Sequence, residues 1–505
     1  MKIRKIIFYF FILGTFIFYI YNLINFQFSK EGAFYKELSK KQFFIKRIIK
    51  GKRGTIYDRK SKILATSLRE GNEWKRTYPY GEICAPLIGI VGEDGKGLEG
   101  IEYYYDKILR GEKEIQVLYR TRNGKLVNLP DFKNKEPGDG KDIVLTIDVD
   151  LQEISYKNLK ECVKENNAKR GFVIILNPKT GEILTCASYP SFDPHRIPNN
   201  FLPEYRALPI TYLYEPGSVF KIVTYATFIK ERMYEKFNQI DITPGSLVIR
   251  GLEIHDPEPH LRKKNLVLPS EVIVYSSNIG ISKIALLLPP KKIYETALLM
   301  GFGVKTGVDF PGEESGKLKD YREWDEHYQA NFSFGQGVFV NGLQVALAYA
   351  IIANGGYLLE PFILKEVIDG KKLKVRNYPK IIRKVFNDEE IRIMKNTLKM
   401  VVEEGTGRNA KIPGISLCGK TGTAQKFDIY ERKYDMDKGI MSFVGFFPEE
   451  DPEYLIYIMI DEPKKGRFAS EIVAPYFKKI VQEMLPLIKP FKEFEKNLIA
   501  RNEIG

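Results

Sequence analysis

The stretch that decides the fold is Tyr214-Glu215-Pro216-Gly217-Ser218-Val219-Phe220-Lys221, which holds the only Ser-x-x-Lys in the chain. On the first turn of a helix, a serine and a lysine at this spacing lie on the same face. Pro216 and Gly217 end the preceding segment, so we expect a helix that begins at Ser218. A serine hydroxyl becomes a good nucleophile when a base removes its proton, and Lys221 can be that base if burial lowers its pKa. The spacing alone also fits an ordinary helix, so the interpretation depends on further motifs.

A second short motif, Ser276-Ser277-Asn278, contains the only Ser-x-Asn in the chain. It interrupts a helical pattern that runs from residue 266 to 288, because serine and asparagine favour turns over helix interiors. If this turn reaches the pocket of Ser218, the Ser276 hydroxyl can relay a proton and the Asn278 amide can hold a substrate amide. Taken alone, the triplet fits a polar loop equally well.

Lys-Thr-Gly occurs three times, and the surroundings of each copy decide which one belongs to the site. Lys179-Thr180-Gly181 has the pattern of a hairpin turn between two strands, and Lys305-Thr306-Gly307 lies in a loop punctuated by glycine and proline. Only Lys420-Thr421-Gly422 is followed by another threonine, Thr423, and then by two strand-like segments. We therefore expect the third copy to form the edge of a sheet beside the serine.

The residues of this third copy suit the recognition of a peptide end. Lys420 and Thr421 can meet a carboxylate. Gly422 has no side chain, so a substrate backbone can lie against the strand edge. The backbone N–H groups of Ser218 and Thr423 can face each other as the two donors of an oxyanion hole.

In this order, Ser-x-x-Lys, Ser-x-Asn and Lys-Thr-Gly form the active-serine signature of penicillin-binding proteins and serine β-lactamases. The chain resembles a class B penicillin-binding protein over nearly its whole length. The resemblance is also carried by Arg53-Gly54-x-Ile56-x-Asp58-Arg59, Gly97-Leu98-Glu99-Gly100-Ile101-Glu102, Glu215-Pro216-Gly217-Ser218, Phe334-Gly335-Gln336-Gly337 and Gly419 to Gln425. It implies an α+β fold, with a β-lactamase-like transpeptidase domain of helices on an antiparallel sheet, a small β-rich pedestal domain and an N-terminal transmembrane helix.

The resemblance also implies a reaction, which is peptidoglycan D,D-transpeptidation without a cofactor. Ser218 attacks the carbonyl between two terminal D-alanines of a stem peptide, D-alanine leaves, and an amine of a neighbouring stem resolves the acyl-enzyme. β-Lactams block such enzymes because they mimic the D-Ala-D-Ala end. The catalytic residues implied are Ser218, Lys221, Ser276, Asn278 and Lys420, and the substrate-binding residues are Thr421, Gly422 and Thr423.

Two segments, Ser442-Phe443-Val444-Gly445-Phe446 and Ile460-Asp461-Glu462-Pro463-Lys464, are similar to the division-specific (FtsI-type) branch rather than the elongation branch. This similarity implies septal cell-wall synthesis. The implied partners are peptidoglycan stem peptides, β-lactam antibiotics, the membrane, a polytopic lipid II glycosyltransferase (FtsW-like) and other division proteins. The stretch between Arg59 and Gly97 is short for the family, so we expect a pedestal with a reduced head.

Residues 6–24 are almost entirely apolar and are long enough to cross a bilayer as a helix. Because Lys2, Arg4 and Lys5 precede them, we expect residues 1–5 in the cytoplasm and the bulk of the chain outside the inner (cytoplasmic) membrane. A cleaved signal peptide is the alternative, but no small-residue cleavage site follows the apolar run. The other predicted boundaries are 25–145 for the pedestal, 146–488 for the transpeptidase domain and 489–505 for a charged tail.

Composition narrows the class of partner. A net charge of +14 suits an anionic partner, which could be nucleic acid, a membrane surface or a wall polymer. Nucleic acid is not expected, because the chain has neither zinc-finger spacing nor an RNA-binding signature. The four cysteines form no Cys-x-x-Cys pair, and four histidines in all argue against a Ser-His-Asp triad. The run from His255 to His260 contains prolines that prevent a helical ligand pair, so we expect no metal.

The same motifs also occur in proteins with other functions. A D,D-carboxypeptidase or β-lactamase would hydrolyse the acyl-enzyme, a β-lactam sensor would be acylated without turnover, and a division platform would have lost the chemistry. A sensor needs a signalling domain, for which the short cytoplasmic flank leaves no room, and a platform would show a broken motif. No glutamate lies in a local motif beside residues 276–278 to act as a deacylating base, which favours transfer over hydrolysis.

Overall fold

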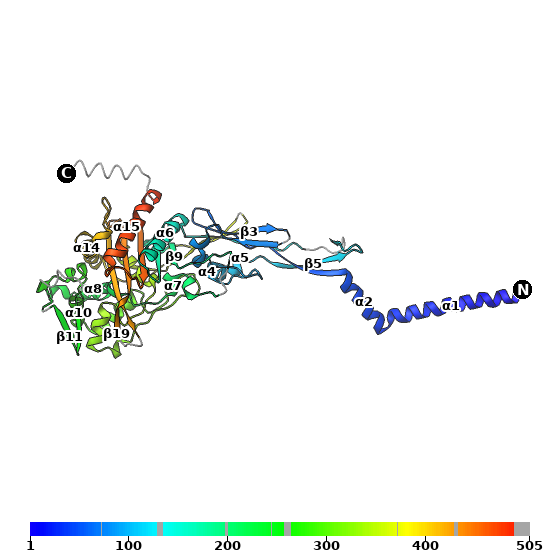
Figure 1. Cartoon of the computed structure of the whole chain (residues 1–505), viewed down its shortest axis with the longest axis horizontal. Coiled ribbons are helices and arrows are strands. Elements are labelled where there is room, and N and C mark those ends of the chain that lie inside the picture. The colour runs from blue at the N-terminus through cyan, green and yellow to red at the C-terminus, as the bar shows by residue number, and fades with distance from the viewer. Residues whose placement is uncertain are drawn as a thin grey trace. The chain divides into compact units, whose positions relative to one another are not determined.

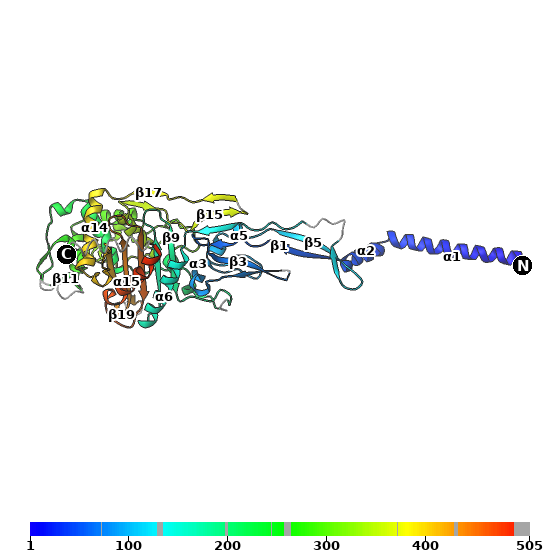
Figure 2. The same ribbon diagram turned by 90° about the horizontal axis from the view of Figure 1, so that it is seen from above.

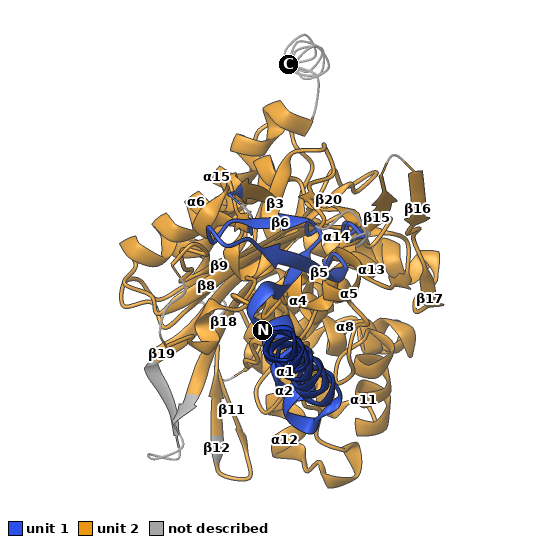
Figure 3. Ribbon diagram, turned by 90° about the vertical axis from the view of Figure 1, so that its right-hand side faces the viewer, with its two compact units in different colours: residues 1–53, 70–74, 110–140 blue, residues 54–69, 75–109, 141–505 orange. Residues whose placement is uncertain are grey.

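The computed structural model of the chain describes residues 1–71, 73–128, 135–196, 200–243, 245–256, 264–370, 372–428 and 433–488. The chain forms two compact units (Figure 3). The first unit holds residues 1–53, 70–74 and 110–140, and the second holds residues 54–69, 75–109 and 141–505. Much of the expected pedestal thus groups with the second unit, and the domain boundaries stay a prediction. The expected tail at 489–505 lies outside the described residues.

The first unit begins with α1 (Lys2–Phe28), a helix of 27 residues that is exposed along its whole length. Of the described helices, it alone is long and apolar enough to cross a membrane. The next helix, α2 (Lys30–Phe43), leads directly into an antiparallel sheet of order β1-β5-β6. Its strands are β1 (Phe44–Lys50), β5 (Lys113–Arg120) and β6 (Leu126–Asn128).

Most residues of a six-stranded mixed sheet of order β16-β15-β7-β2-β3-β4 belong to the second unit. The strand–turn–strand expected after Arg53 is the pair β2–β3, in which Ile56 lies opposite Ala65. Arg76 on β4 forms a buried ion pair with Glu102, with 2.7 Å between Nε and Oε1. The strands are β2 (Ile56–Tyr57), β3 (Ile63–Glu70), β4 (Glu73–Thr77), β7 (Asp142–Leu145), β15 (Leu364–Asp369) and β16 (Lys372–Arg376).

The centre of the second unit is a five-stranded antiparallel sheet of order β18-β19-β20-β8-β9. Its inner strands are apolar at successive positions because both faces of the sheet are covered. Along β8, Phe172 and Ile174 belong to one hydrophobic core, whereas Val173 and Ile175 belong to the other. The strands are β8 (Arg170–Leu176), β9 (Ile183–Tyr189), β18 (Cys418–Asp428), β19 (Lys433–Phe447) and β20 (Tyr454–Asp461).

Helices cover both faces of this sheet. α6 and α15 lie side by side on one face (Figure 1), where Asn158 Nδ2 donates to Glu483 Oε2 at 3.0 Å. α13 belongs to the core on the opposite face. The longer helices are α6 (Val149–Glu165), α8 (Lys221–Lys230), α9 (Pro269–Val274), α10 (Asn278–Leu286), α11 (Pro290–Leu299), α12 (Glu326–Ser333), α13 (Gly342–Ala353), α14 (Asp388–Glu403) and α15 (Ala469–Ile488).

Short helices and strand pairs complete the second unit, and Figure 2 shows β15 and β17 along one margin of it. The short helices are α3 (Ala85–Ile88), α4 (Gly100–Tyr104), α5 (Asp106–Leu109) and α7 (Leu208–Thr211). The strand pairs are β10 (Ile240–Asp241) with β13 (Leu266–Val267), β11 (Ser246–Ile249) with β12 (Leu252–His255), and β14 (Tyr357–Leu359) with β17 (Ile381–Lys384).

The expected α+β fold is confirmed, and one local expectation is corrected. The α-helix does not begin at Ser218, because a 3-10 turn, η3 (Gly217–Phe220), precedes α8. The last helix, α15, begins at Ala469 and contains Pro475 in its interior. A proline inside a helix removes one backbone hydrogen bond, and here the long helix continues past it.

Candidate active site

The two residues of the Ser-x-x-Lys motif lie on the tight turn that leads into α8. A 3-10 turn has about three residues per turn, so side chains at i and i+3 eclipse one another more closely than on an α-helix. Ser218 lies within η3, and Lys221 is the first residue of α8. Ser218 is 9% exposed, whereas Lys221 is completely buried. The serine is therefore reachable from the surface, but the lysine has lost its hydration.

Close backbone contacts hold this turn between β18 and a glycine-rich loop. Gly217 has a φ of +60°, and a Cβ atom there would lie 2.6 Å from the carbonyl oxygen of Thr423. Its N–H donates to the carbonyl oxygen of Gly335 at 3.3 Å. The preceding Glu215 accepts a hydrogen bond from the N–H of Gly337 at 2.6 Å. Only glycine at position 217 allows the serine turn to approach the Lys-Thr-Gly strand this closely.

Gly422 serves packing inside the protein, which differs from the expected role of admitting a substrate backbone. A Cβ atom at Gly422 would lie 2.3 Å from Ser442 Oγ and 2.8 Å from Val219 Cγ1. Both atoms belong to the protein, and Val219 directly follows Ser218. The absent side chain thus lets β18 pack against the serine turn. Its contact with substrate stays a prediction.

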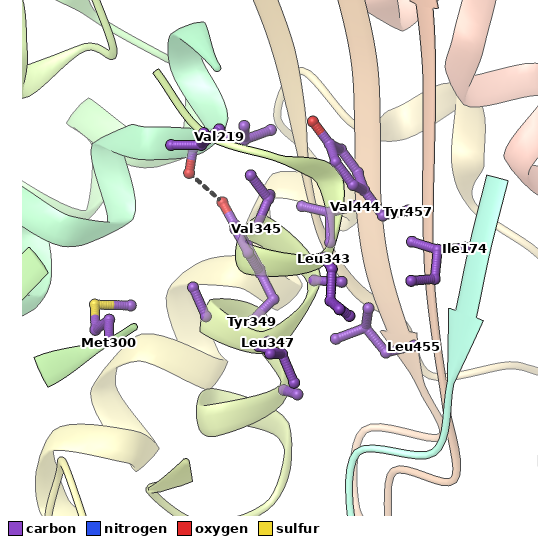
Figure 4. Packing of buried hydrophobic residues seen from close by; sticks show 14 of the residues in the cluster. Ile174, Val219, Met300, Leu343, Val345, Leu347, Tyr349, Val444, Leu455 and Tyr457 are labelled. Carbon is purple, nitrogen blue, oxygen red and sulfur yellow. Dashed lines mark hydrogen bonds between the residues drawn. The ribbon is translucent and has the colours of Figure 1, made fainter. Parts of the chain in front are cut away.

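A buried tyrosine on α13 also holds the turn that carries Ser218 (Figure 4). Tyr349 on α13 is fully buried, and its hydroxyl donates to the carbonyl oxygen of Val219 at 2.8 Å. The hydroxyls of Tyr214 and Tyr457 form another hydrogen bond of 2.8 Å nearby in the same core. A buried hydroxyl lowers stability unless it is bonded, so these bonds fix the positions of the groups that make them.

The Ser-x-Asn motif forms the turn between α9 and α10, as expected. Ser276 has a φ of +59°, a left-handed conformation that costs a non-glycine residue roughly 1–3 kcal/mol. Ser277 caps α10, because its hydroxyl accepts from the N–H of Gly280 at 2.8 Å. The strained backbone of Ser276 persists because the contacts around the turn stabilise it.

Asp256 is a buried residue of this site that the sequence reasoning missed. Its carboxylate accepts from Ser277 Oγ at 2.8 Å, from Asn278 N at 2.6 Å and from Ile279 N at 3.0 Å. A carboxylate at a helix N-terminus is favoured by the unpaired amides and by the helix dipole. The sequence showed only a His-Asp-Pro loop, and the residues that follow, 257–263, lie outside the described part of the chain. No sequence pattern marked Asp256 as the partner of a turn twenty residues away.

The three motifs meet at the hydroxyl of Ser276. Lys221 Nζ lies 3.2 Å from Ser276 Oγ, 2.6 Å from the Ser276 carbonyl oxygen and 2.8 Å from Asn278 Oδ1. Lys420 Nζ donates to the same Ser276 Oγ at 2.9 Å. The structure therefore brings four of the five predicted catalytic side chains into one hydrogen-bonded group, next to the turn that carries Ser218.

The electrostatics of this group favour an uncharged amine at Lys221. Burial lowers the pKa of Lys221 well below its usual range, because the ammonium form loses its hydration. The positive charge of Lys420 lowers this pKa further, and the negative charge of Asp256 opposes the shift. Lys221 can therefore accept a proton, which an ordinary lysine at neutral pH cannot.

The two threonines of the third motif have different surroundings. Thr421 is buried, and its hydroxyl lies 2.7 Å from that of Thr406. Thr423 is exposed, and its hydroxyl accepts from the N–H of Ala469 at 3.4 Å. Thr423 is thus the more accessible of the two, and the substrate-binding role of both stays a prediction.

The other two Lys-Thr-Gly copies lie in turns and loops, as expected. Gly181 has a φ of +79° in the hairpin between β8 and β9, and Lys179 forms an ion pair with Asp451. The Thr306 hydroxyl donates to Glu313 at 2.6 Å within a loop. The Thr306 bonds stay within the loop, whereas the carbonyl oxygen of Gly181 accepts from the N–H of Phe362 at 3.2 Å.

Comparisons with known proteins agree with this geometry. Residues 171–482 match the family described as the penicillin binding protein transpeptidase domain, and residues 69–145 match the penicillin-binding protein dimerisation domain. The chain is 34% identical to the probable peptidoglycan D,D-transpeptidase PbpC of Pseudomonas aeruginosa, over 86% of this chain and 75% of the relative. It is 34% identical to stage V sporulation protein D of Bacillus subtilis, over 82% of this chain and 65% of that relative. It is 32% identical to the peptidoglycan D,D-transpeptidase FtsI of Buchnera aphidicola subsp. Baizongia pistaciae, over 83% of this chain and 71% of that relative.

Solved structures give the same result. Penicillin binding protein 3 of Mycobacterium tuberculosis, in its apo form, superposes with a TM-score of 0.75 at 27% identity, covering 87% of this chain and 97% of that one. The same protein has also been solved in complex with aztreonam, with a TM-score of 0.74. The chain therefore belongs to the class B penicillin-binding proteins.

We predict that Gly422→Ala slows acylation by a β-lactam and lowers the stability of the fold by about 1–3 kcal/mol, because the new methyl group overpacks the contact with Ser442 and Val219. Urea unfolding and stopped-flow acylation measure the two effects. The double variant Gly422→Ala/Ser442→Ala removes the nearest clashing atom and should recover part of both losses. Acylation of the single variant at the wild-type rate would contradict the packing role.

We predict that Asp256→Asn slows acylation by about ten- to a hundredfold while the protein stays folded, because an amide cannot accept the same hydrogen bonds and the Ser276 turn shifts. Glu253→Gln is the matched control, since Glu253 lies on the adjacent strand β12 and is 54% exposed. The control should acylate normally. Equal rates for the two variants would show that the carboxylate does not position the site.

Proposed function

We propose that this chain is a serine-type peptidoglycan D,D-transpeptidase that cross-links stem peptides in septal cell-wall synthesis. The observation that carries the proposal is the Ser276 hydroxyl shared by Lys221 and Lys420 beside the Ser218 turn. Membership of the penicillin-binding proteins and the names of the relatives, which are D,D-transpeptidases, support the reaction.

In the acylation half of the reaction, the neutral amine of Lys221 takes the proton of the Ser218 hydroxyl. The Ser218 oxygen attacks the carbonyl carbon of the penultimate D-alanine, and the backbone N–H groups of Ser218 and Thr423 stabilise the oxyanion. The C–N bond then breaks, and the leaving amine of D-alanine receives a proton through the Ser276 hydroxyl. Lys420 binds the terminal carboxylate of the donor, and Asn278 holds its amide.

In the second half, an amine of a neighbouring stem attacks the ester carbonyl. The ester C–O bond breaks, a new amide bond forms, and the amine proton returns to the Ser218 oxygen through the same lysine and serine. Hydrolysis would need a base that activates water. Asp256 is poorly placed for that role, because its oxygens already accept hydrogen bonds from Ser277, Asn278 and Ile279. This arrangement favours transfer over carboxypeptidase or β-lactamase activity.

The septal role and the partners rest on resemblance. A relative named FtsI supports the division branch, whereas the sporulation relative keeps a different wall-synthesis role open as the second candidate. We propose that α1 anchors the chain in the inner membrane with its N-terminus in the cytoplasm, because basic residues precede the apolar run. A polytopic lipid II glycosyltransferase of the FtsW type and other division proteins are the proposed partners, and β-lactams are the proposed inhibitors.

We predict that Ser218→Ala abolishes covalent labelling by a fluorescent penicillin, because no other hydroxyl occupies the position of the nucleophile. A labelling gel on the full chain measures this, and the thermal unfolding temperature checks that the variant is folded. Ser277→Ala is the matched control, since that hydroxyl caps α10 and should leave part of the labelling intact. Full labelling of a folded Ser218→Ala variant would show that another residue is acylated.

We predict that the acylation rate falls as the pH drops through the pKa of Lys221 and is constant above it, because only the neutral amine accepts the serine proton. This acid limb lies well below the usual lysine range. Asp256→Asn removes the charge that raises this pKa, so its acid limb should move to lower pH even though its maximum rate is smaller. Rate–pH profiles test both statements. An acid limb that moves to higher pH in Asp256→Asn would contradict the assignment of Lys221 as the base.

A further inference from the structure

The end of α1 coincides with the depth at which a membrane-spanning helix leaves the bilayer. Its 27 residues span about 40 Å at about 1.5 Å per residue. The apolar part, from residue 6 to 24, covers about 29 Å, close to the roughly 30 Å thickness of a hydrocarbon core. The segment from Phe26 to Ser29 therefore lies in the interfacial layer, if α1 spans the membrane.

The chain makes a defined bend at this depth, visible between α1 and α2 in Figure 1. Ser29 has extended backbone, its hydroxyl donates to the carbonyl oxygen of Phe26 at 2.8 Å, and it accepts from the N–H of Gly32 at 2.9 Å. Gly32 is the one buried residue of α2, and a Cβ atom there would lie 1.8 Å from the same Phe26 oxygen. The bend requires glycine at position 32, so it is a specific structure and not a loose linker.

One side of α2 carries exposed apolar side chains, and Glu31 lies on the same side in the first turn. Phe34, Tyr35 and Leu38 are 61%, 55% and 40% exposed, and their spacing places them on one side of the helix. Lys36 and Lys40 lie one turn apart on the other side. The ring of Tyr35 lies 5.9 Å from that of Phe26, so the apolar side continues the surface of α1.

We propose that α2 lies in the membrane interface, with Phe34, Tyr35 and Leu38 inserted at the boundary between headgroups and acyl chains. Aromatic side chains favour this layer, and lysines reach lipid phosphates from it. The occupant of the apolar side is thus phospholipid of the bilayer that α1 crosses. The inference rests on the proposed membrane anchoring by α1. Because β1 begins at Phe44, directly after α2, the interfacial helix would also hold the first strand of the small sheet at the membrane surface.

Tryptophan quenching in proteoliposomes of phosphatidylcholine and phosphatidylglycerol tests the proposal. The two native tryptophans, Trp74 and Trp324, are replaced by phenylalanine in the full chain, and one tryptophan is then introduced at a time. Lipids brominated near the headgroup should quench the tryptophan fluorescence of the Phe34→Trp variant. This quenching should be stronger, by about twofold or more, than that of the Lys36→Trp variant on the opposite side of the helix. Equal quenching of the two variants would overturn the proposal. The vesicles hold only this chain and lipid, so the expected result also excludes a protein partner as the occupant.

Two further variants separate the possible causes of failure. Phe16→Trp, in the middle of α1, should be quenched by lipids brominated deep in the acyl chains. If it is not, the anchoring itself is wrong; if it is quenched and Phe34→Trp is not, only the interfacial helix is wrong. Gly32→Ala should remove the difference between positions 34 and 36, whereas Gly14→Ala, where a Cβ would meet nothing within 4 Å, should preserve it. A difference that survives Gly32→Ala would show that the bend does not place α2.

Discussion

The site depends on the placement of two lysine amines around one buried hydroxyl. Lys221 and Lys420 both lie within hydrogen-bonding distance of Ser276 Oγ, and both are almost completely buried. Two charged ammonium groups this close in a medium of low polarity would repel each other strongly. Keeping Lys221 neutral relieves this repulsion, and the same neutral amine is what a serine nucleophile needs. The burial that disfavours the charged form of Lys221 therefore also keeps its amine able to accept the serine proton.

Backbone contacts then place the nucleophile beside this group. The turn of Ser218 is fixed by Gly217 against β18, by Gly422 against Val219 and by the hydrogen bond from the Tyr349 hydroxyl to the Val219 carbonyl oxygen. Packing of this kind tolerates little change, because interiors are close-packed and added atoms displace their neighbours. Asp256 has the matching role on the other motif, where it holds the strained turn of Ser276 through three hydrogen bonds.

The family resemblance carried by the three motifs implied the fold class, which is confirmed. The threonine and the two strands that follow Lys420 distinguished the copy of Lys-Thr-Gly whose lysine contacts Ser276. The sequence did not predict Asp256, since a carboxylate that binds a distant helix N-terminus has no local signature. It did not predict that Gly422 packs against Ser442 and Val219, because a missing side chain does not say which neighbour requires its absence. The start of α8 was also misplaced, since 3-10 and α-turns share the same residues at their N-termini.

The central claim is that Lys221, Ser276 and Lys420 act as one connected group. A double-mutant cycle of Ser276→Ala and Lys420→Ala on the rate of β-lactam acylation tests it most directly. If the hydroxyl and the amine act through their shared hydrogen bond, the double variant should be hardly slower than the slower single variant. If the two losses multiply, the residues act independently, and the account of the site is wrong.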